Sequence, residues 1–281
     1  MKTAALVLVS LSLAASGVAQ TWQPNVTNAK FETRAYSGNL ATQLHAAAPA
    51  WFGYAERSAR SDNGNCCWNG SSGCWLEQEH GKQHTAGAAA GSPRPVQLEG
   101  SDAIAVLFRV ANDGVEKLRV YSLSCPLDAG GLSFVWLTGV PEQASLAFLK
   151  TFVTNGGHNA DAAVFAISQH AGPEADSDLI EIANRDPSGH VRGQALFWLA
   201  QKAGNKAAAT ITNAIQNDPD TEVKKKAVFA LSQLPKDEGV PKLIEVAKTQ
   251  RNPAVRKQAF FWLGQSHDPR ALAFIEQVLT K

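Results

Sequence analysis

The second half of the chain repeats itself, and this feature constrains the fold more than any other. A seven-residue block recurs four times, beginning at Ala163, Ala195, Ala227 and Ala259, so that each copy starts 32 residues after the last. Each block ends in glutamine. A second apolar set begins ten residues after each glutamine, at Leu179, Ile211, Leu243 and Ile275. A fixed period in this range predicts stacked copies of one supersecondary unit.

Each unit is predicted to be a pair of helices. Val191, Ala195 and Leu199 recur at helical spacing, and turn residues such as Asp186-Pro187 separate the two apolar sets. Asn159 stands where the later units have valine, as expected of a first repeat that packs on a different domain. The expected pairs are 141–154 with 158–170, 173–184 with 190–202, 205–217 with 221–233 and 237–250 with 254–265, and a helix at 268–280 caps the stack.

The repeated residues resemble the HEAT family, whose units have a first helix, an Asp-Pro turn and a second helix that begins Val-Arg. Asp186-Pro187 with Val191-Arg192 follows this pattern, and so does Asp218-Pro219 with Val223-Lys224. The resemblance covers about 141–281, and the short period is similar to the HEAT-like repeats of bilin lyases. The motif Phe-Trp-Leu-Gly-Gln at 261–265 also resembles that of uncharacterised exported bacterial HEAT-repeat proteins. The resemblance implies an α-solenoid in which the second helices line a concave surface.

Residues 20–138 have the pattern of β-structure. Two apolar runs, 103–110 and 117–124, flank the turn Asn112-Asp113-Gly114, which predicts a β-hairpin. Further strands are expected at 31–36, 50–55 and 132–137. The predicted fold class is therefore α+β and multi-domain, with a β-rich domain at 20–138 and a HEAT-like α-solenoid at 139–281.

The first nineteen residues are predicted to be a secretory signal peptide. Lys2 precedes an apolar stretch, and small residues lead to an expected cleavage site after Ala19. We therefore expect an exported protein, periplasmic or extracellular. An even number of cysteines in such a protein favours disulfides. The four are Cys66, Cys67, Cys74 and Cys125. We expect Cys66 or Cys67 to pair with Cys74 and the other with Cys125.

The repeats contain two sets of candidate partner-binding residues. Basic residues fall near the start of successive second helices, at Arg192, Lys224, Lys225, Arg256 and Lys257. Phenylalanines occupy one position of each block, at Phe165, Phe197, Phe229 and Phe261. A row of exposed rings is typical of a binding surface. The alternatives are ion pairs of the basic residues with Asp186, Asp218 and Asp220, and burial of the rings against the next repeat.

The tryptophans of the repeats have a separate interpretation. Trp198 and Trp262 alternate with Ala166 and Ala230 at one position of the block, and we expect this alternation of large and small side chains to fill the core.

Catalytic and metal-binding motifs are absent. The chain lacks Gly-x-Ser-x-Gly, His-Glu-x-x-His and Ser-x-x-Lys, and the N-terminal carboxylates Glu77, Glu79 and Glu99 are scattered. The cysteines with His80 and His84 miss the usual spacing of a zinc site. His158, His170, His190 and His267 sit at helix ends or turns, where capping or exposure is expected. We expect no catalytic residues, no metal and no cofactor.

The sequence predicts a non-catalytic protein that binds a protein partner or acts as a scaffold. The charge is nearly balanced, with 26 Lys and Arg against 25 Asp and Glu, which argues against nucleic acid as a partner. After the signal peptide, no apolar run approaches the ~20 residues of a transmembrane helix. The alternative is a hydrolase or metal-dependent enzyme, with its site in the β-rich domain and the solenoid as a substrate platform. Bilin lyase activity is a third, weaker option.

Overall fold

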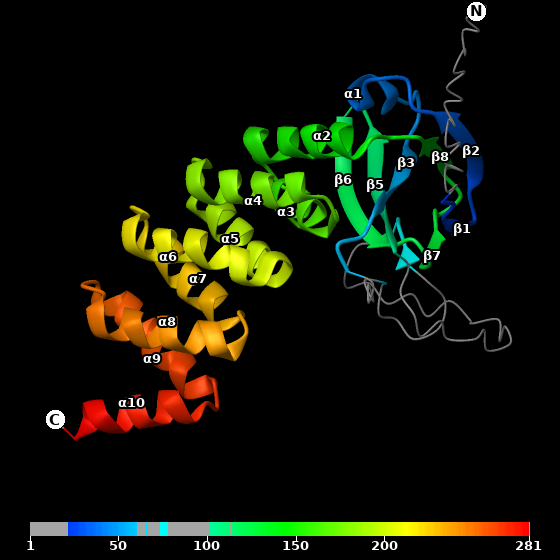
Figure 1. The fold of residues 1–281 in the computed structure, drawn as a ribbon. Coiled ribbons are helices and arrows are strands. Elements are labelled where there is room, and N and C mark those ends of the chain that lie inside the picture. Colours follow the sequence, from blue (N-terminus) through cyan, green and yellow to red (C-terminus); the bar gives the residue numbers. More distant parts are fainter. Residues whose placement is uncertain (1–21, 61–65, 67–73, 78–101, 113, 281) are drawn as a thin grey trace, which may run out of the picture.

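The computed structural model describes residues 22–60, 66, 74–77, 102–112 and 114–280 (Figure 1). Two small sheets form one end of the molecule, and a succession of helices extends away from them (Figure 1). The expected signal peptide, Cys67, Glu79, Glu99 and both histidines of the zinc alternative lie outside the described residues.

A five-stranded sheet is built from the apolar runs of the N-terminal half. The antiparallel pair β5 and β6 confirms the predicted hairpin, and β8 lies parallel to both β2 and β3. Apart from the exposed edge strand β2, the alternation of side chains along the strands gives the sheet two buried faces. In spatial order its strands are β2 (Lys30–Ala35), β8 (Ser133–Thr138), β3 (Ala50–Arg57), β5 (Ala103–Ala111) and β6 (Gly114–Ser122).

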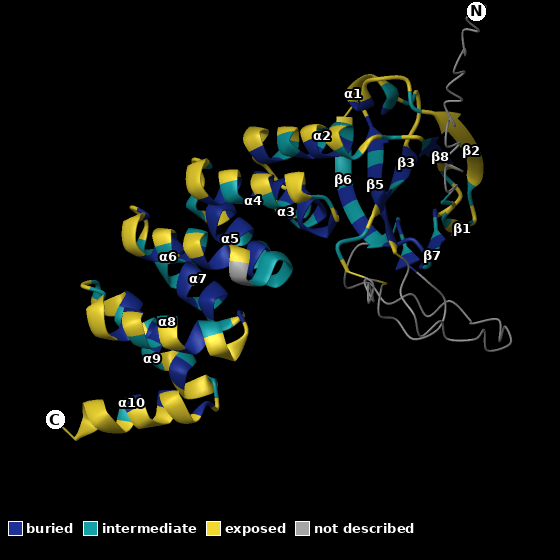
Figure 2. Ribbon diagram, viewed as in Figure 1, coloured by how far each residue is buried: buried dark blue, intermediate teal, exposed yellow. Residues whose placement is uncertain are grey.

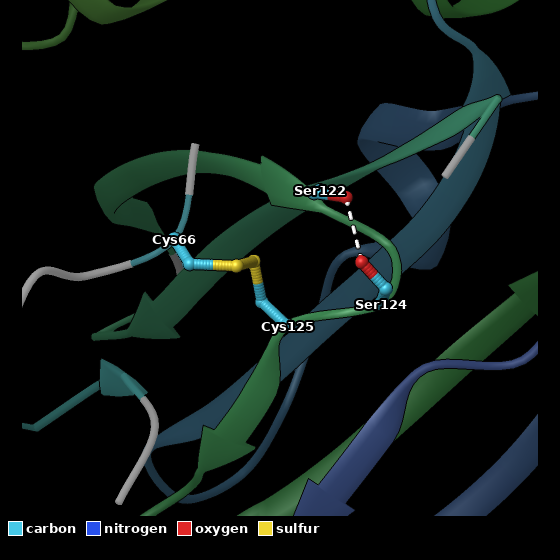
Figure 3. The surroundings of a disulfide bond; sticks show 4 residues. All are labelled: Cys66, Ser122, Ser124 and Cys125. Carbon is cyan, nitrogen blue, oxygen red and sulfur yellow. Dashed lines mark hydrogen bonds between the residues drawn. A yellow bond between two sulfur atoms is a disulfide. The ribbon is translucent and has the colours of Figure 1, made fainter. Parts of the chain in front are cut away.

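One face of this sheet packs on a smaller sheet that the sequence pattern did not predict. Its three short strands are β1 (Asn25–Thr27), β7 (Pro126–Asp128) and β4 (Cys74–Trp75), all parallel. A disulfide joins Cys66 to the buried Cys125, which directly precedes β7, with their Cα atoms 5.5 Å apart (Figure 3). Cys74 is also disulfide-bonded. One of the two pairings predicted for Cys125 is therefore confirmed, and Cys67, the partner then left for Cys74, lies outside the described residues.

The helical region begins directly after β8. The four-residue helix α1 (Leu40–Gln43) precedes β3 in the chain and is not part of this region. The helices of the region follow one another along the stack in Figure 1. They are α2 (Glu142–Asn155), α3 (Ala160–Gln169), α4 (Pro173–Arg185), α5 (Gly189–Ala203), α6 (Ala208–Asn217), α7 (Thr221–Ser232), α8 (Lys236–Thr249), α9 (Pro253–Gln265) and α10 (Pro269–Leu279), with a 3-10 turn at Gly204–Ala207. We call α3, α5, α7 and α9 the second helices. Each contacts the next one, and each packs on the helix that precedes it in the chain.

The other face of the five-stranded sheet packs on the first two of these helices. Phe108 of β5 contacts the rings of Phe148 and Phe152 in α2. The side-chain amide of Asn159 donates to the carbonyl oxygen of Val115 in β6, 3.2 Å away. This contact explains why asparagine replaces valine in the first repeat. One continuous apolar core runs from this face of the sheet through all the helices (Figure 2).

Within the described residues, the longest helices are too short and too polar to cross a bilayer.

Candidate functional site

Arg192 is buried and makes an internal contact, so it cannot meet a partner. Its side chain is enclosed between α5 and the turn before α7, and the residue is only 8% exposed. Its Nε and one terminal nitrogen donate to the two carboxylate oxygens of Asp218, at 2.8 and 2.9 Å. The other terminal nitrogen donates to the carbonyl oxygens of Asp186 and Pro187. The ion-pair interpretation is correct for this residue, and its assignment to the partner-binding set is wrong.

Lys224 and Arg256 repeat part of this arrangement. The ammonium of Lys224 donates to the carbonyl oxygen of Gln216 at the end of α6, at 3.0 Å. A terminal nitrogen of Arg256 donates to the carbonyl oxygen of Gln250 at the end of α8, also at 3.0 Å. Each cation therefore satisfies an orphan carbonyl at the negative end of the preceding helix. A basic residue in the first turn of a second helix is tolerated because it caps its neighbour.

Lys225 and Lys257 are the members of the basic set most open to a partner. The ammonium of Lys225 lies 2.9 Å from the exposed carboxylate of Glu222, a pair that contributes little because water screens it. Lys257 is exposed, and its ammonium has no hydrogen bond or ion pair with any described residue. Each lysine stands four residues before a phenylalanine of the repeated row, on the same face of its helix.

The four phenylalanines form a surface that we call the aromatic face: Phe165, Phe197, Phe229 and Phe261. The first three are half-buried, and Phe261 is 52% exposed. The face belongs to the second helices, and two tryptophans link its rings into one series. Neighbouring ring centroids are 4.7 Å apart for Phe165–Trp198, 4.8 Å for Trp198–Phe197, 5.6 Å for Phe197–Phe229, 4.8 Å for Phe229–Trp262 and 4.9 Å for Trp262–Phe261.

The tryptophans fulfil in part the packing role that their alternation with alanine predicts, because Trp198 and Trp262 are half-buried and pack against the core. Trp198 and Trp262 each contact the phenylalanine of the preceding second helix. Ala166 and Ala230, at the same position of the other two repeats, are fully buried. Each indole thus holds a ring of the aromatic face in place, and the exposed edges of the rings remain available for contact.

A buried polar network joins the sheet to the helices, and sequence reasoning missed it. The Nδ1 of His170 lies 2.8 Å from the carbonyl oxygen of Ala166, which can only accept, so Nδ1 carries the proton. The Ser145 hydroxyl therefore donates to His170 Nε2, and the Tyr54 hydroxyl donates to Ser145, both at 2.8 Å. Burial lowers the pKa of His170 to about 4, although its hydrogen bond to Ala166 acts in the opposite direction. Of the two expectations for His170, capping is correct, because Nδ1 donates to the carbonyl oxygen of Ala166 at the end of α3, and exposure is wrong.

The Ser145–His170 pair has the chemistry of a nucleophile and its base, but no substrate can reach it. Tyr54, Ser145 and His170 are all fully enclosed between β3, α2 and the loop after α3. The repeat pattern does not predict these contacts, because the three residues come from three different elements. The network satisfies buried polar groups at the junction of sheet and helices.

Glu56 lies on the same strand as Tyr54 and is also buried. Burial, and secondly the nearby carboxylate of Glu142, raise the pKa of Glu56 to about 8. Its Oε1 has no hydrogen-bond partner among the described residues. Glu56 is therefore an acid held in its neutral form at the junction.

Glu77 is tied into the sheet. It accepts hydrogen bonds from Trp51 Nε1 at 2.7 Å and from Arg109 Nε at 2.9 Å. Burial raises its pKa, but the hydrogen bonds from Arg109 and Trp51 outweigh this effect and leave the pKa lowered. Arg109 also contacts Glu116. In the described part of the chain, no three His, Cys, Asp or Glu side chains come together in a way that could hold a metal ion.

Comparison with known proteins identifies the helical region. A family model described as HEAT repeats matches residues 175–249 and 208–281. Residues 175–281 therefore contain HEAT repeats, and the HEAT resemblance drawn from the sequence is confirmed for this stretch. A comparison with curated proteins finds no match.

Two solved structures are similar to parts of this chain at low identity. One is the complex of CpcE and CpcF of phycocyanin lyase from Nostoc sp. PCC7120, at 17% identity and a TM-score of 0.40, covering 50% of this chain and 91% of that chain. The other is human deoxyhypusine hydroxylase in complex with glycerol, at 18% identity and a TM-score of 0.37, covering 45% of this chain and 44% of that chain.

Proposed function

We propose that this protein is an exported, non-catalytic protein that binds another protein through its HEAT repeats. In this proposal α2 to α9 form four stacked helix pairs, a solenoid at 139–281 capped by α10. The β-rich domain at 20–138 anchors the first pair. Repeat stacks present extended surfaces whose side chains come from several units, which suits recognition of a protein.

The aromatic face is the observation that carries this proposal. Its rings are linked from α3 to α9 and are only half covered. A row of partly exposed aromatic side chains on a rigid scaffold is typical of the anchors of a protein interface. Lys225 and Lys257 stand one helical turn before Phe229 and Phe261, so a partner that covers the rings also meets two cations.

Site-directed photocrosslinking tests which layer of helices meets the partner. Benzoylphenylalanine in place of Gln194 or Gln233 reports on the aromatic face, because each stands within one helical turn of a ring. The matched controls replace Glu181 of α4 and Glu245 of α8, which are exposed on the other layer of helices. Crosslinks to one defined protein from the first two positions only support the proposal, and crosslinks confined to the control positions would exclude this face.

Charge reversal at Lys225 and Lys257 then measures the contribution of the cations. The double variant Lys225→Glu, Lys257→Glu is expected to bind the crosslinked partner at least about tenfold more weakly, with unchanged helicity by circular dichroism. The control reverses Lys236 and Lys242 of α8. Equal binding by both double variants would remove the lysines from the interface.

Export has its own experiment. Cleavage after Ala19 leaves a protein that begins at Gln20, and two closed disulfides make it four hydrogen masses lighter than the reduced chain. Intact mass measurement of the protein from the cell envelope and from the medium shows whether the signal peptide has been cleaved and whether the disulfides are closed. The fraction that contains the protein identifies its compartment. A full-length, reduced protein in the cytosol would refute the export proposal.

The enzyme alternative gains no support from the described residues. Cys66, Cys74 and Cys125 are oxidised and cannot serve as thiolate ligands. Glu77 is held by Arg109, and the buried Ser145 is out of reach of a substrate.

A further inference from the structure

The far end of the helical region carries most of the large exposed apolar side chains of the described chain. Phe261 of α9 and Leu272, Val278 and Leu279 of α10 are four of the five such residues, and the fifth, Phe31, lies in the sheet. Leu272 is 59% exposed and Leu279 is 80% exposed. Ile275, between them on the same side of α10, is half-buried. Figure 2 shows α10 exposed along most of its length. We call Phe261, Leu272, Ile275 and Leu279 the terminal face.

Comparison with the equivalent positions of the earlier repeats shows that the terminal face has no described helix covering it. Positions 32, 64 and 96 residues before Ile275 are Leu243, Ile211 and Leu179, and all three are fully buried. The counterparts of Leu279 are Ala247, Ile215 and Ala183, which are buried as well. In each case a second helix follows and packs on them: α9 on α8, α7 on α6 and α5 on α4. No described helix follows α10.

The same missing helix accounts for the exposure of Phe261. Each second helix also packs on the previous one, and Phe229 of α7 stacks on Phe197 of α5 with the two ring planes 7° apart. Phe261 has no such neighbour from a next layer. One helix placed on α10 and α9, as α7 lies on α6 and α5, covers Phe261, Leu272, Ile275 and Leu279 together.

The repeats also specify the side chains of the helix that fits. The buried stripe of each second helix places alanine at its centre, at Ala195, Ala227 and Ala259, flanked by valine and leucine. A small residue there leaves room for the large residue at the centre of the first helix. A second copy of α10 offers leucine, isoleucine and leucine instead, so two terminal faces present large side chains to each other. The complementary partner is a helix with a Val-x3-Ala-x3-Leu stripe.

We propose that the terminal face is a docking site for an amphipathic helix of a partner protein, which completes a fifth helix pair. The covering helix has a small residue opposite Ile275 and packs its apolar stripe along Leu272 and Leu279. This site is separate from the aromatic face except at Phe261, which lies at the edge of both.

A peptide copied from α7 tests this proposal directly. The peptide 219–234 carries the Val223, Ala227 and Leu231 stripe, and in the folded protein Phe229 of α7 stacks on Phe197 of α5, the counterpart of Phe261. Labelled with a fluorophore and titrated with the full chain, it is expected to bind saturably in an anisotropy assay. The variant Leu272→Gln, Leu279→Gln is expected to weaken binding at least about tenfold. The peptide with Ala227→Leu is expected to bind the unchanged protein at least about tenfold more weakly as well, because the larger leucine side chain clashes with Ile275.

The control variant is Ala273→Gln, an exposed position of α10 away from the terminal face, and it is expected to bind like the unchanged protein. Equal binding by the double variant or by the Ala227→Leu peptide would overturn the proposal, and so would no saturable binding up to about 1 mM. Sedimentation of the full chain covers the second-copy alternative. A dimer that the Leu272→Gln, Leu279→Gln variant dissociates would assign the face to self-association. Because these leucines lie outside the aromatic face, either proposal can fail without the other.

Discussion

The guanidinium of Arg192 and the carboxylate of Asp218 form two parallel hydrogen bonds between successive repeats, at 2.8 and 2.9 Å. Both side chains are almost fully enclosed. Burial raises the pKa of Asp218, but the hydrogen bonds from Arg192 outweigh this and hold it below the usual value. The pair links α5 to the turn before α7, so it connects one repeat to the next.

Removing Arg192 is expected to destabilise the protein strongly. Arg192→Ala leaves the buried carboxylate of Asp218 without its cation, with the backbone N–H of Asp220 still donating to it, and the free energy of unfolding should fall by about 3 kcal/mol. Urea unfolding followed by circular dichroism measures the change. Lys225→Ala is the control, because its exposed pair with Glu222 is expected to contribute at most about 1 kcal/mol. Equal losses in the two variants would show that the Arg192 pair is not a structural link.

Glu56 is expected to make the protein less stable as the pH rises. Its pKa is about 8 in the folded protein against 4.5 for a free glutamate, so the folded state holds the proton more tightly. The contribution of Glu56 to stability is complete below pH 4.5 and is lost as the pH rises through 8. Glu56→Gln should therefore raise the melting temperature at pH 8.5 and change it little at pH 4.5. A variant with the same effect at both pH values would show that Glu56 does not titrate in this way.

His170 is expected to have the opposite dependence. Its pKa is about 4 in the folded protein, below the ordinary 6.5, so its contribution to stability is present above pH 6.5 and is lost as the pH falls through 4. Protonation places a hydrogen on Nε2 and removes the acceptor of the Ser145 hydroxyl. A histidine titration by NMR should show one imidazole that stays neutral at pH 5, and this resonance should be missing in His170→Gln. An ordinary titration of every histidine near pH 6.5 would contradict the buried network.

The Cys66–Cys125 disulfide is expected to stabilise the β-rich end of the molecule. It closes a loop between residues 59 apart in sequence, and its loss should cost about 2–4 kcal/mol. The double variant Cys66→Ser, Cys125→Ser avoids a stray thiol and should melt at a lower temperature than the unchanged protein. Partial reduction with stepwise alkylation of the two neighbouring cysteines, followed by digestion and peptide sequencing by mass spectrometry, should pair Cys125 with Cys66. A linkage of Cys125 to Cys67 would contradict the structure.

Two features of the molecule could be predicted from the sequence because they depend on local spacing. The 32-residue period determines where the helices begin and end, since each unit repeats the same apolar positions and turn residues. The turn at Asn112 and the apolar runs beside it predict the hairpin of β5 and β6 for the same reason. The Phe and Lys positions on the second helices also followed from the period, although not how far each ring is covered.

The remaining features depend on residues that are distant in sequence, and only the tertiary structure decided them. The sequence alone suggests that Arg192 is a surface cation, whereas the structure buries it against Asp218 of the next repeat. Tyr54, Ser145 and His170 show no common pattern, because a hydrogen bond between elements leaves no periodic signal along the chain. The exposure of Leu272 and Leu279 is likewise invisible in the sequence, where they look like any buried first-helix residues. The repeat pattern determined which side chains face a neighbouring helix, and the tertiary structure decided whether that neighbour is present, because burial depends on the atoms that surround a side chain.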